Sequence, residues 1–590
     1  MDGDIIYFDL IRAEIQSSTY PIIYPLFNCG GIRENIFEMT QRGVKRKREI
    51  STSSPLSAFE TLPSEMHLGF IRYLDVWDLR ALRATCRTMH EAVDYYIQPC
   101  TKRRRTTLGE RAKGDFPDFG LFATISAINR PMYVLQDPAA WDTLENLDLQ
   151  GCLLGALPAS LVQFSALRAL DLRLNDLTTL PEPIRHLRAL EYLDVGSNDL
   201  VELPGWIGEF AALRYLHLKD SKLRGIPESI ANLRLLEGIY LDENPLAAFP
   251  EVLCGLASLL FLSMRKCTLD ELPHSIGHLR ALKHLRLKEN RIQSLPVSIG
   301  DLEALTKLDL EENRLEWIPA EIGRLGALML LSLEFNRLEI LPAEIGDLGA
   351  LEILVLRGNS LRALPDTLSR LRSLHSLDAG FNFLAELPHS IGNLRALKTL
   401  DLRSNCISVI PASIDELGAL KKLYLGCNNL RQVPASLGRL TALENLSLVR
   451  NKLSSIPGEL GNLGALCNLD IAENELCALP DTLQGLQSLH TLYVYSNPLR
   501  AFPRSFGELR SLRNLTLGGK TPFELPATFW KLTELSHIHF VYGTESIRAH
   551  PSAFGLLRRF LADMSNVYDA TTGLPAACPP ARVGAGSQDT

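Results

Sequence analysis

The chain has 590 residues, of which 46% are hydrophobic and 22% charged, and its formal net charge is −7 at pH 7. With this acidic balance and a pI near 6.1 the protein lacks a bulk attraction for nucleic acid, so we expect no nucleic-acid partner. No apolar run approaches the roughly 18 residues that a membrane-spanning helix needs, and the acidic start MDGDIIYFDL does not resemble a signal peptide, so we expect no membrane partner.

The cysteines and the basic clusters give information on the cellular compartment of the protein. The eleven cysteines are odd in number, scattered and without a C-x-x-C pair, which favours a reducing compartment and predicts a cytoplasmic protein. Runs of lysine and arginine stand at 45–48 and 102–105. Such runs act either as nuclear-import signals or as solvated linker charge, and the sequence leaves both interpretations open.

Residues 56–100 follow an N-terminal segment, 1–55, that shows no clear period and to which we assign no fold. Phe70, Ile71 and Leu74 recur at spacings of three to four residues, as on one helix face. Asp78 is placed to cap a second helix, and Cys86 begins a third. The sequence therefore predicts three short helices, followed by a basic linker over 101–120.

The spacing of LPSE at 62–65, FI at 70–71, YL at 73–74, DL at 78–79 and CR at 86–87 resembles an F-box without a gap. In that family the leading Leu-Pro and the apolar helix faces dock on the Skp adaptor of cullin-RING ubiquitin ligases. Thr85 and Met89 depart from the family, which usually has an aliphatic residue and a tryptophan there, and they predict a looser third helix. The alternative is a small helical cap for the region that follows. The resemblance assigns adaptor binding to Leu62, Pro63, Glu65, Met66, Phe70, Ile71, Leu74, Leu79, Leu82 and Cys86.

Residues 144–531 repeat one pattern, LxxLxLxxNxLxxLPxxIgxL, seventeen times at a step of 23 residues without an insertion. A proline falls on every step from Pro158 to Pro526. In a typical unit, Leu308 and Leu310 alternate with a polar residue, which predicts a short strand with one buried face. The part after the proline has apolar residues at spacings of three, which predicts a short helix or a 3₁₀ turn.

This period and its L-x-x-L-x-L-x-x-N core resemble the leucine-rich repeats, and the LPxxIGxL half looks like their Ras-group intracellular subclass. The resemblance implies an α/β solenoid, a horseshoe with a parallel inner sheet and a helical or 3₁₀ outer face. Residues 121–143 read as a degenerate opening repeat and 532–564 as a closing cap. The final segment, 565–590, is rich in Gly, Ala, Pro and Ser and is predicted to be disordered.

The residue after the strand is asparagine in thirteen of the seventeen repeats. A buried amide both donates and accepts hydrogen bonds, so we expect it to satisfy backbone groups of neighbouring turns rather than to take part in catalysis. The four exceptions are Cys152, Ser221, Cys267 and Lys520.

The inward-facing side chains of the strands are where the repeats differ most. We expect an aromatic stripe, a basic block and an acidic block to form a partner-binding footprint on the concave face, because aromatic residues and arginine anchor protein interfaces. The alternative is that these positions drift freely and the charges only solubilise the face. The footprint comprises Tyr192, Tyr215, Tyr240, Phe261, Arg265, Arg286, Lys288, Asp309, Glu311, Glu334 and Phe335.

No motif in the chain predicts catalysis, a cofactor or a metal site. The sequence has no phosphate-binding glycine loop and no nucleophile elbow, and its closely spaced histidine pairs, 274/278 and 537/539, lack the further ligands that zinc needs. We therefore expect a non-enzymatic substrate receptor of a cullin-RING ligase, with the F-box on the adaptor and the repeats on a target protein. The competing hypothesis is a scaffold that binds a small GTPase or a phosphatase.

Overall fold

The structure, a computed structural model, describes residues 144–151, 157, 161–162, 164–518, 523–541, 547–549, 551–557, 559 and 567–569. The segment 1–55, the predicted F-box at 56–100, the linker at 101–120 and the opening repeat at 121–143 lie outside the described residues. Cys152 and Lys520 lie outside them as well.

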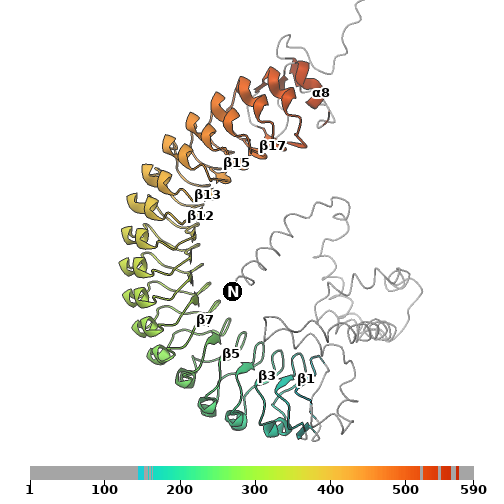
Figure 1. The fold of residues 1–590 in the computed structure, drawn as a ribbon, viewed down its shortest axis with the longest axis vertical. Helices are drawn as coiled ribbons and strands as arrows, with labels where there is room; N and C mark the ends of the chain where they lie inside the picture. The colour runs from blue at the N-terminus through green and yellow to red at the C-terminus, as the bar shows by residue number, and fades with distance from the viewer. Residues whose placement is uncertain are drawn as a thin grey trace, which may run out of the picture. The chain divides into compact units, whose positions relative to one another are not determined.

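Eighteen short strands form one parallel sheet, which lines the inner side of the arc of repeats (Figure 1). Each strand pairs with the equivalent residues one step away, as Leu308 does with Leu285 and Leu331. This confirms the predicted parallel solenoid. The strands are β1 (Asn146–Asp148), β2 (Ala169–Asp171), β3 (Tyr192–Asp194), β4 (Tyr215–His217), β5 (Gly238–Tyr240), β6 (Phe261–Ser263), β7 (His284–Arg286), β8 (Lys307–Asp309), β9 (Leu330–Ser332), β10 (Ile353–Val355), β11 (Ser376–Asp378), β12 (Thr399–Asp401), β13 (Lys422–Tyr424), β14 (Asn445–Ser447), β15 (Asn468–Asp470), β16 (Thr491–Tyr493), β17 (Asn514–Leu517) and β19 (His537–Phe540).

The outer layer consists of five-residue 3₁₀ helices, so the structure selects the 3₁₀ alternative. Each of them follows a proline whose φ lies between −58° and −73°, the angle that its ring imposes. The proline therefore sets where the chain turns outward. These helices are η4 (Glu182–His186), η5 (Gly205–Glu209), η6 (Glu228–Asn232), η7 (Glu251–Gly255), η8 (His274–His278), η9 (Val297–Asp301), η10 (Ala320–Arg324), η11 (Ala343–Asp347), η12 (Asp366–Arg370), η13 (His389–Asn393), η14 (Ala412–Glu416), η15 (Ala435–Arg439), η16 (Gly458–Asn462), η17 (Asp481–Gly485), η18 (Arg504–Glu508) and η19 (Ala527–Lys531).

The glycine of the outer half permits close packing between these helices. A Cβ atom on Gly346 would lie 2.1 Å from the carbonyl oxygen of Thr367, and one on Gly461 would lie equally close to that of Thr482. Such distances are far inside van der Waals contact, so a larger residue at Gly346 or Gly461 would force the two consecutive 3₁₀ helices to shift.

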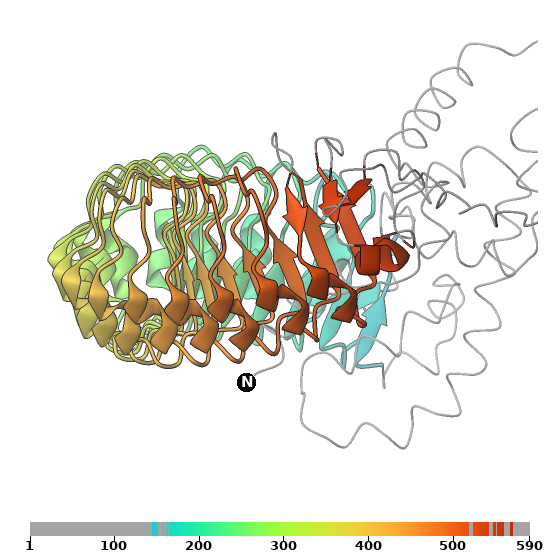
Figure 2. The same ribbon diagram turned by 90° about the horizontal axis from the view of Figure 1, so that it is seen from above.

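The core lies between the two layers and continues through every described repeat. Leu308, Leu310, Ile322, Leu325 and Leu328 are all fully buried, which confirms the predicted inside positions. Seen from above, the repeats overlie one another as similar coils (Figure 2). Because a single 23-residue coil has no second face to close its core, each repeat depends on its neighbours for burial.

The asparagine side chain connects adjacent repeats, as predicted. Nδ2 of Asn313 donates to the carbonyl oxygens of Leu287 and Leu310 at 2.9 and 3.1 Å. Its Oδ1 accepts a hydrogen bond from the backbone N–H of Ile292 at 3.1 Å. One side chain thus satisfies buried groups in its own repeat and in the preceding one.

The residue before the asparagine adopts a left-handed backbone conformation, which the sequence did not reveal. Its φ is 51° at Ser197, 53° at Glu312 and 55° at Arg450. Glycine is favoured in this region, yet only Gly151 and Gly358 use it in this column of the described repeats. The signal was hidden because the column has no common residue type.

Two exceptions to the asparagine column behave differently. The Cys267 thiol approaches the carbonyl oxygens of Leu241 and Arg265 at 3.1 and 3.4 Å and so replaces part of the amide's role. The Ser221 hydroxyl is buried and has no hydrogen-bond partner among the described residues. A serine side chain is too short to reach the groups that asparagine reaches.

The array ends in a second small parallel sheet that the sequence did not predict. Its strands are β18 (Glu524–Leu525), β20 (Ile547–Ala549) and β21 (Val567–Asp569), and η20 (Pro551–Ala553) and α8 (Phe554–Leu557) lie beside them in the chain. The strand β21 falls within 565–590, which composition predicted to be disordered. It pairs in parallel with β20, and Ala549 lies opposite Asp569.

Exchanging asparagine and serine between adjacent repeats tests the role of this column. Asn244→Ser should lower the free energy of unfolding by about 1–3 kcal/mol, because it strands the carbonyl oxygens of Leu218 and Leu241 and the N–H of Leu223. Ser221→Asn should raise it by about 0.5–1.5 kcal/mol by supplying the missing bonds. Denaturant titrations followed by circular dichroism measure both. A loss of stability in Ser221→Asn would contradict this assignment.

Candidate functional site

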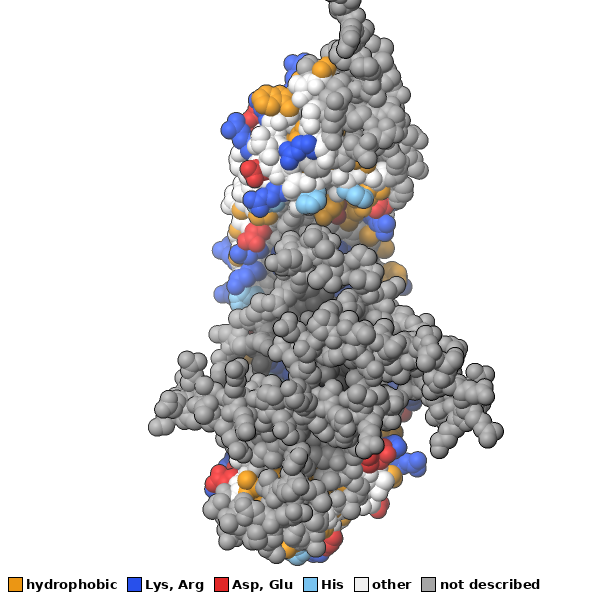
Figure 3. Space-filling view, turned by 90° about the vertical axis from the view of Figure 1, so that its right-hand side faces the viewer, with side chains coloured by type: hydrophobic (Ala, Val, Ile, Leu, Met, Phe, Trp, Pro, Cys, Tyr) orange, Lys and Arg blue, Asp and Glu red, His pale blue; other side chains and the backbone are white. Residues whose placement is uncertain are grey.

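The concave wall is formed by three side chains in each repeat. These are the first and third residues of the strand and the residue two positions after it, exemplified by Lys307, Asp309 and Glu311 in the repeat of β8. Because the backbone runs in register, equivalent side chains of adjacent repeats are direct neighbours. Seen from this side, acidic, basic and histidine side chains are interspersed on repeats near the C-terminal end (Figure 3).

The predicted aromatic stripe forms a cluster that includes two histidines. The ring of His217 stacks on Tyr240 at 4.1 Å and lies 5.1 Å from Tyr192, and His284 meets the ring of Phe261 at 4.6 Å. Burial lowers the pKa of both imidazoles to about 4, so they are neutral near pH 7. The histidines escaped prediction because the strand pattern alone does not show which side chains touch across repeats.

A glycine makes room for this cluster. A Cβ atom on Gly238, the first residue of β5, would lie 2.8 Å from the ring of Tyr215 and 3.3 Å from that of Tyr240. The hydroxyl of Tyr215 donates to Glu237 at 2.9 Å, which fixes the orientation of that ring. The absence of a side chain at position 238 therefore allows the two tyrosine rings to lie over the strand.

An acidic pair beside the aromatic cluster shares one arginine. The guanidinium of Arg173 donates to Asp171 at 2.5–3.0 Å and lies 3.2 Å from Asp194. Burial, followed by the nearby charge of Asp171, raises the pKa of Asp194 to about 7. The positive charge of Arg173 is therefore used within the wall, by the carboxyl groups of Asp171 and Asp194.

The predicted basic and acidic blocks are paired with each other. The ammonium of Lys288 lies 2.6 Å from Glu311 and 3.3 Å from Glu312, and Arg357 lies 3.4 Å from Glu334. Their charges are largely balanced within the wall. Other members of the predicted footprint stay accessible, among them Arg286 and Phe335, which are both exposed.

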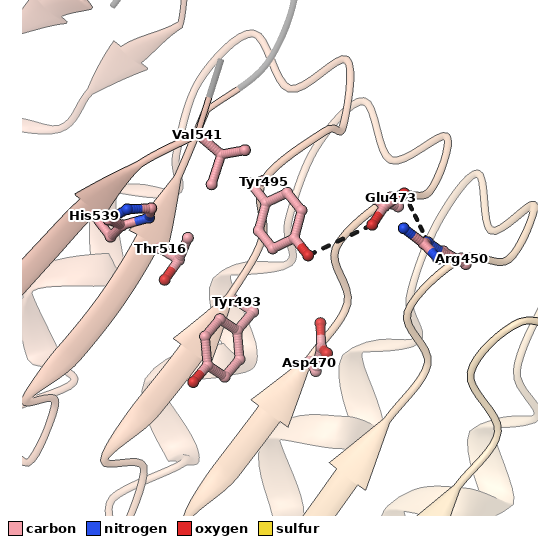
Figure 4. Close-up of a pocket in the computed structure, with 8 residues that line it drawn as sticks. All are labelled: Arg450, Asp470, Glu473, Tyr493, Tyr495, Thr516, His539 and Val541. Atoms are coloured by element: carbon pink, nitrogen blue, oxygen red, sulfur yellow. Dashed lines mark hydrogen bonds and ion pairs between the residues drawn. The ribbon is translucent and has the colours of Figure 1, made fainter. Parts of the chain in front are cut away.

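A hollow opens at the C-terminal end of the wall, outside the predicted footprint (Figure 4). Its volume is about 420 Å³. Extending the same wall positions to the last repeats of the sequence would have found its tyrosines and its aspartate. We call it the C-terminal hollow; its lining residues are Arg450, Asp470, Glu473, Tyr493, Tyr495, Thr516, His539 and Val541.

The charges in the C-terminal hollow are unevenly compensated. Glu473 is held by Arg450 at 2.9 Å and receives the hydroxyl of Tyr495 at 3.5 Å. Asp470 accepts the backbone N–H of Ala472 at 3.1 Å, and burial raises the pKa of its carboxyl group to about 6. In Figure 4 this carboxylate points toward the space between Tyr493 and Glu473.

The described residues contain no group of three or more His, Cys, Asp or Glu side chains arranged to hold a metal ion. No helix within the described part of the chain is long and apolar enough to cross a membrane. The adaptor-binding residues predicted between Leu62 and Cys86 lie outside the described residues, so the structure places none of them.

Comparison with known proteins identifies the repeats. A model of the leucine-rich repeat region matches residues 205–286, 272–339 and 379–478, and a leucine-rich repeat model matches 142–200. The solved structure of a leucine-rich repeat protein from Leptospira interrogans is 35% identical, with 62% of this chain and 93% of that chain covered and a TM-score of 0.59. The chain belongs to the leucine-rich repeat proteins.

Two other solved structures share the fold. A TDR receptor is 28% identical, with 65% of this chain and 70% of that chain covered and a TM-score of 0.54. The functional domain of InlJ from Listeria monocytogenes is 19% identical, with 66% and 75% covered and a TM-score of 0.50. No curated protein matches the chain. None of the matching family models includes residues 56–100.

The pKa of Asp470 predicts a pH-dependent effect of Asp470→Asn. Between about pH 4 and pH 6 the unfolded chain ionises this carboxyl group while the folded chain keeps it protonated, so the wild type loses stability as the pH rises. The variant lacks this loss and can still accept the N–H of Ala472. Its stability relative to wild type should therefore increase from pH 4 to pH 6 and level off above pH 7, as measured by denaturant titration. A constant difference across this range would contradict the raised pKa.

Proposed function

We propose that the protein is a non-enzymatic receptor that holds a target protein on its concave wall and presents it to a cullin-RING ubiquitin ligase through residues 56–100. The observation that carries the first half is the wall itself. It is a continuous surface of differing side chains on a backbone hydrogen-bonded in register over eighteen strands. A rigid surface of this kind suits a protein partner, because little conformational entropy is lost on binding.

The ligase half of the proposal rests on the F-box resemblance of LPSE through Cys86. Three short helices of about forty residues expose more apolar surface than they can bury among themselves, so an adaptor would cover the remainder. The receptor would contribute proximity rather than chemistry. Tethering raises the effective concentration of the target near the ubiquitin-transferring enzyme.

The cysteines support the intracellular setting that this role requires. Cys254, Cys267, Cys406, Cys427, Cys467 and Cys477 are all unpaired in the described part of the chain. Free thiols at this density fit a reducing cytoplasm or nucleus better than an oxidising compartment.

The alternative function is a scaffold for a small GTPase or a phosphatase, in which residues 56–100 only cap the repeats. The similarity of the outer half to the Ras-group subclass favours it. Both functions use the concave wall, so target binding does not distinguish them. Binding to a Skp-type adaptor distinguishes them, because only the ligase role requires it.

Charge reversal at an exposed wall position tests target capture. Arg286→Glu should reduce the recovery of wall-bound partners about tenfold or more, because a reversed charge inside an interface is repelled. Arg280→Glu is the matched control, since it makes the same change in the exposed turn between η8 and β7. The measurement is quantitative mass spectrometry of proteins that copurify with the tagged full chain. Equal recovery of every partner with both variants would place the target-binding surface elsewhere.

Adaptor binding tests the ligase role. The intact protein should bind a purified Skp-type adaptor, and the double variant Leu62→Ala with Pro63→Ala should abolish this binding, as followed by biolayer interferometry. Arg286→Glu should leave it unchanged, because that residue belongs to the wall. If the intact protein fails to bind under conditions in which another F-box protein binds, the scaffold alternative replaces the ligase proposal.

A further inference from the structure

The C-terminal hollow contains the carboxylate of Asp470, which lacks the arginine partner that two equivalent aspartates have. Asp470 is the third residue of β15, the position that Asp171 occupies in β2 and Asp401 in β12. At all three positions the aspartate Oδ1 accepts a backbone N–H two residues further on, at 3.0–3.1 Å. The backbone therefore presents the three carboxylates in the same way.

Two of these carboxylates receive an arginine from their own repeat. Arg173 donates to Asp171 through Nε at 3.0 Å and Nη2 at 2.5 Å, and Arg403 binds Asp401 with nearly the same distances. The residue in the place of these arginines beside Asp470 is Ala472. The repeat of β15 thus keeps the acceptor and lacks the cation.

Neighbouring repeats do not supply that cation. Burial raises the pKa of other aspartates at this strand position, and nearby basic groups partly offset that rise, as Arg265 and Lys288 do for Asp309 and as Arg357 and Arg403 do for Asp378. Among the described residues no cation acts on Asp470 in this way. The nearby Arg450 is bound to Glu473 instead.

Aromatic rings stand beside this carboxylate. Tyr493 and Tyr495 come from the next repeat and line the same hollow, with Tyr493 40% exposed. A tyrosine face attracts a cation, and a planar guanidinium can stack on it while it donates two hydrogen bonds to a carboxylate. An ammonium group is a compact point charge and cannot do both in this way.

We infer that the C-terminal hollow receives an arginine side chain of the bound target, whose guanidinium pairs with Asp470 and lies against Tyr493 and Tyr495. This inference rests on the proposed function, because it specifies one contact of the protein held on the wall. The incoming arginine pairs with Asp470 as Arg173 pairs with Asp171 and Arg403 with Asp401.

Saturation-transfer difference NMR on the full chain tests this with Nα-acetyl-arginine amide as the probe. Nα-acetyl-citrulline amide has nearly the same shape without the charge and serves as the matched ligand. The arginine probe should give saturation transfer and the citrulline probe only background. A signal from Nα-acetyl-lysine amide larger than that from the arginine probe would overturn the assignment to guanidinium.

Three variants locate the binding. Asp470→Asn should weaken the arginine probe about tenfold or more, since it removes the charge of a bidentate partner. Ala472→Arg should do the same by supplying the cation from within the repeat. Asp378→Asn makes the matched change at the same strand position, where Gly380 donates its N–H at 2.9 Å, and should leave the signal unchanged. Thermal unfolding of each variant confirms that the array is intact.

The pH dependence gives an independent readout. Binding should strengthen as the pH rises through about 6, where Asp470 ionises. The other ionisable groups that line the hollow are Glu473 and Arg450, which are paired, the hydroxyls of Tyr493 and Tyr495, and His539. His539→Gln should therefore retain the pH dependence, and Asp470→Asn should lose it.

Equal saturation transfer to the arginine probe in wild type and Asp470→Asn would overturn the inference. A loss of signal in Asp378→Asn as large as that in Asp470→Asn would also overturn it. Either result would leave the proposed function standing, because target capture sensitive to Arg286→Glu and adaptor binding through residues 56–100 are measured separately. Failure of those two experiments with a positive arginine signal would instead leave the hollow as a binding site in a protein of another role.

Discussion

The hydrogen bonds of the asparagine amide hold successive repeats at a fixed spacing and register. After each strand the chain turns away from the sheet through a left-handed residue, which exposes carbonyl and N–H groups inside the stack. The side-chain amide of Asn198 forms hydrogen bonds with these groups in its own repeat and in the preceding one. It donates to the carbonyl oxygens of Leu172 and Val195 and accepts from the backbone N–H of Leu177. A polar group left unsatisfied in this interior costs about 1–3 kcal/mol, so the asparagine ladder adds to the stability that leucine burial gives the array.

This ladder also explains where the sequence is free to vary. With the backbone fixed by asparagine, proline and glycine, the three wall positions of each repeat carry few structural duties. Side chains there range from glycine at 238 to tyrosine at 493, while the leucine between them is retained. The wall therefore presents differing side chains on a nearly constant support, and the C-terminal hollow is one such local difference, lined by residues of the last repeats.

The sequence predicted the array well because its causes are local. A period of 23 residues, the leucine alternation and the proline each act within one repeat or between adjacent ones. The pairing of basic with acidic wall residues was not predicted, although it too lies between adjacent repeats. Lys288 and Glu311 are 23 residues apart and stand in one column, but they were grouped along the chain into separate basic and acidic blocks. The small terminal sheet could not be foreseen, since it does not depend on a pattern.

The uniform step between strands gives the wall a scale of length. The aromatic cluster at β5 and the hollow at β15 are ten strands apart, a separation of about 48 Å at the usual spacing of parallel strands. Because each repeat packs only on its neighbours, gain or loss of whole repeats between these regions would change the separation in steps of about 5 Å and leave both regions intact. A ligand that touches both is thereby selected by its span as well as by its chemistry.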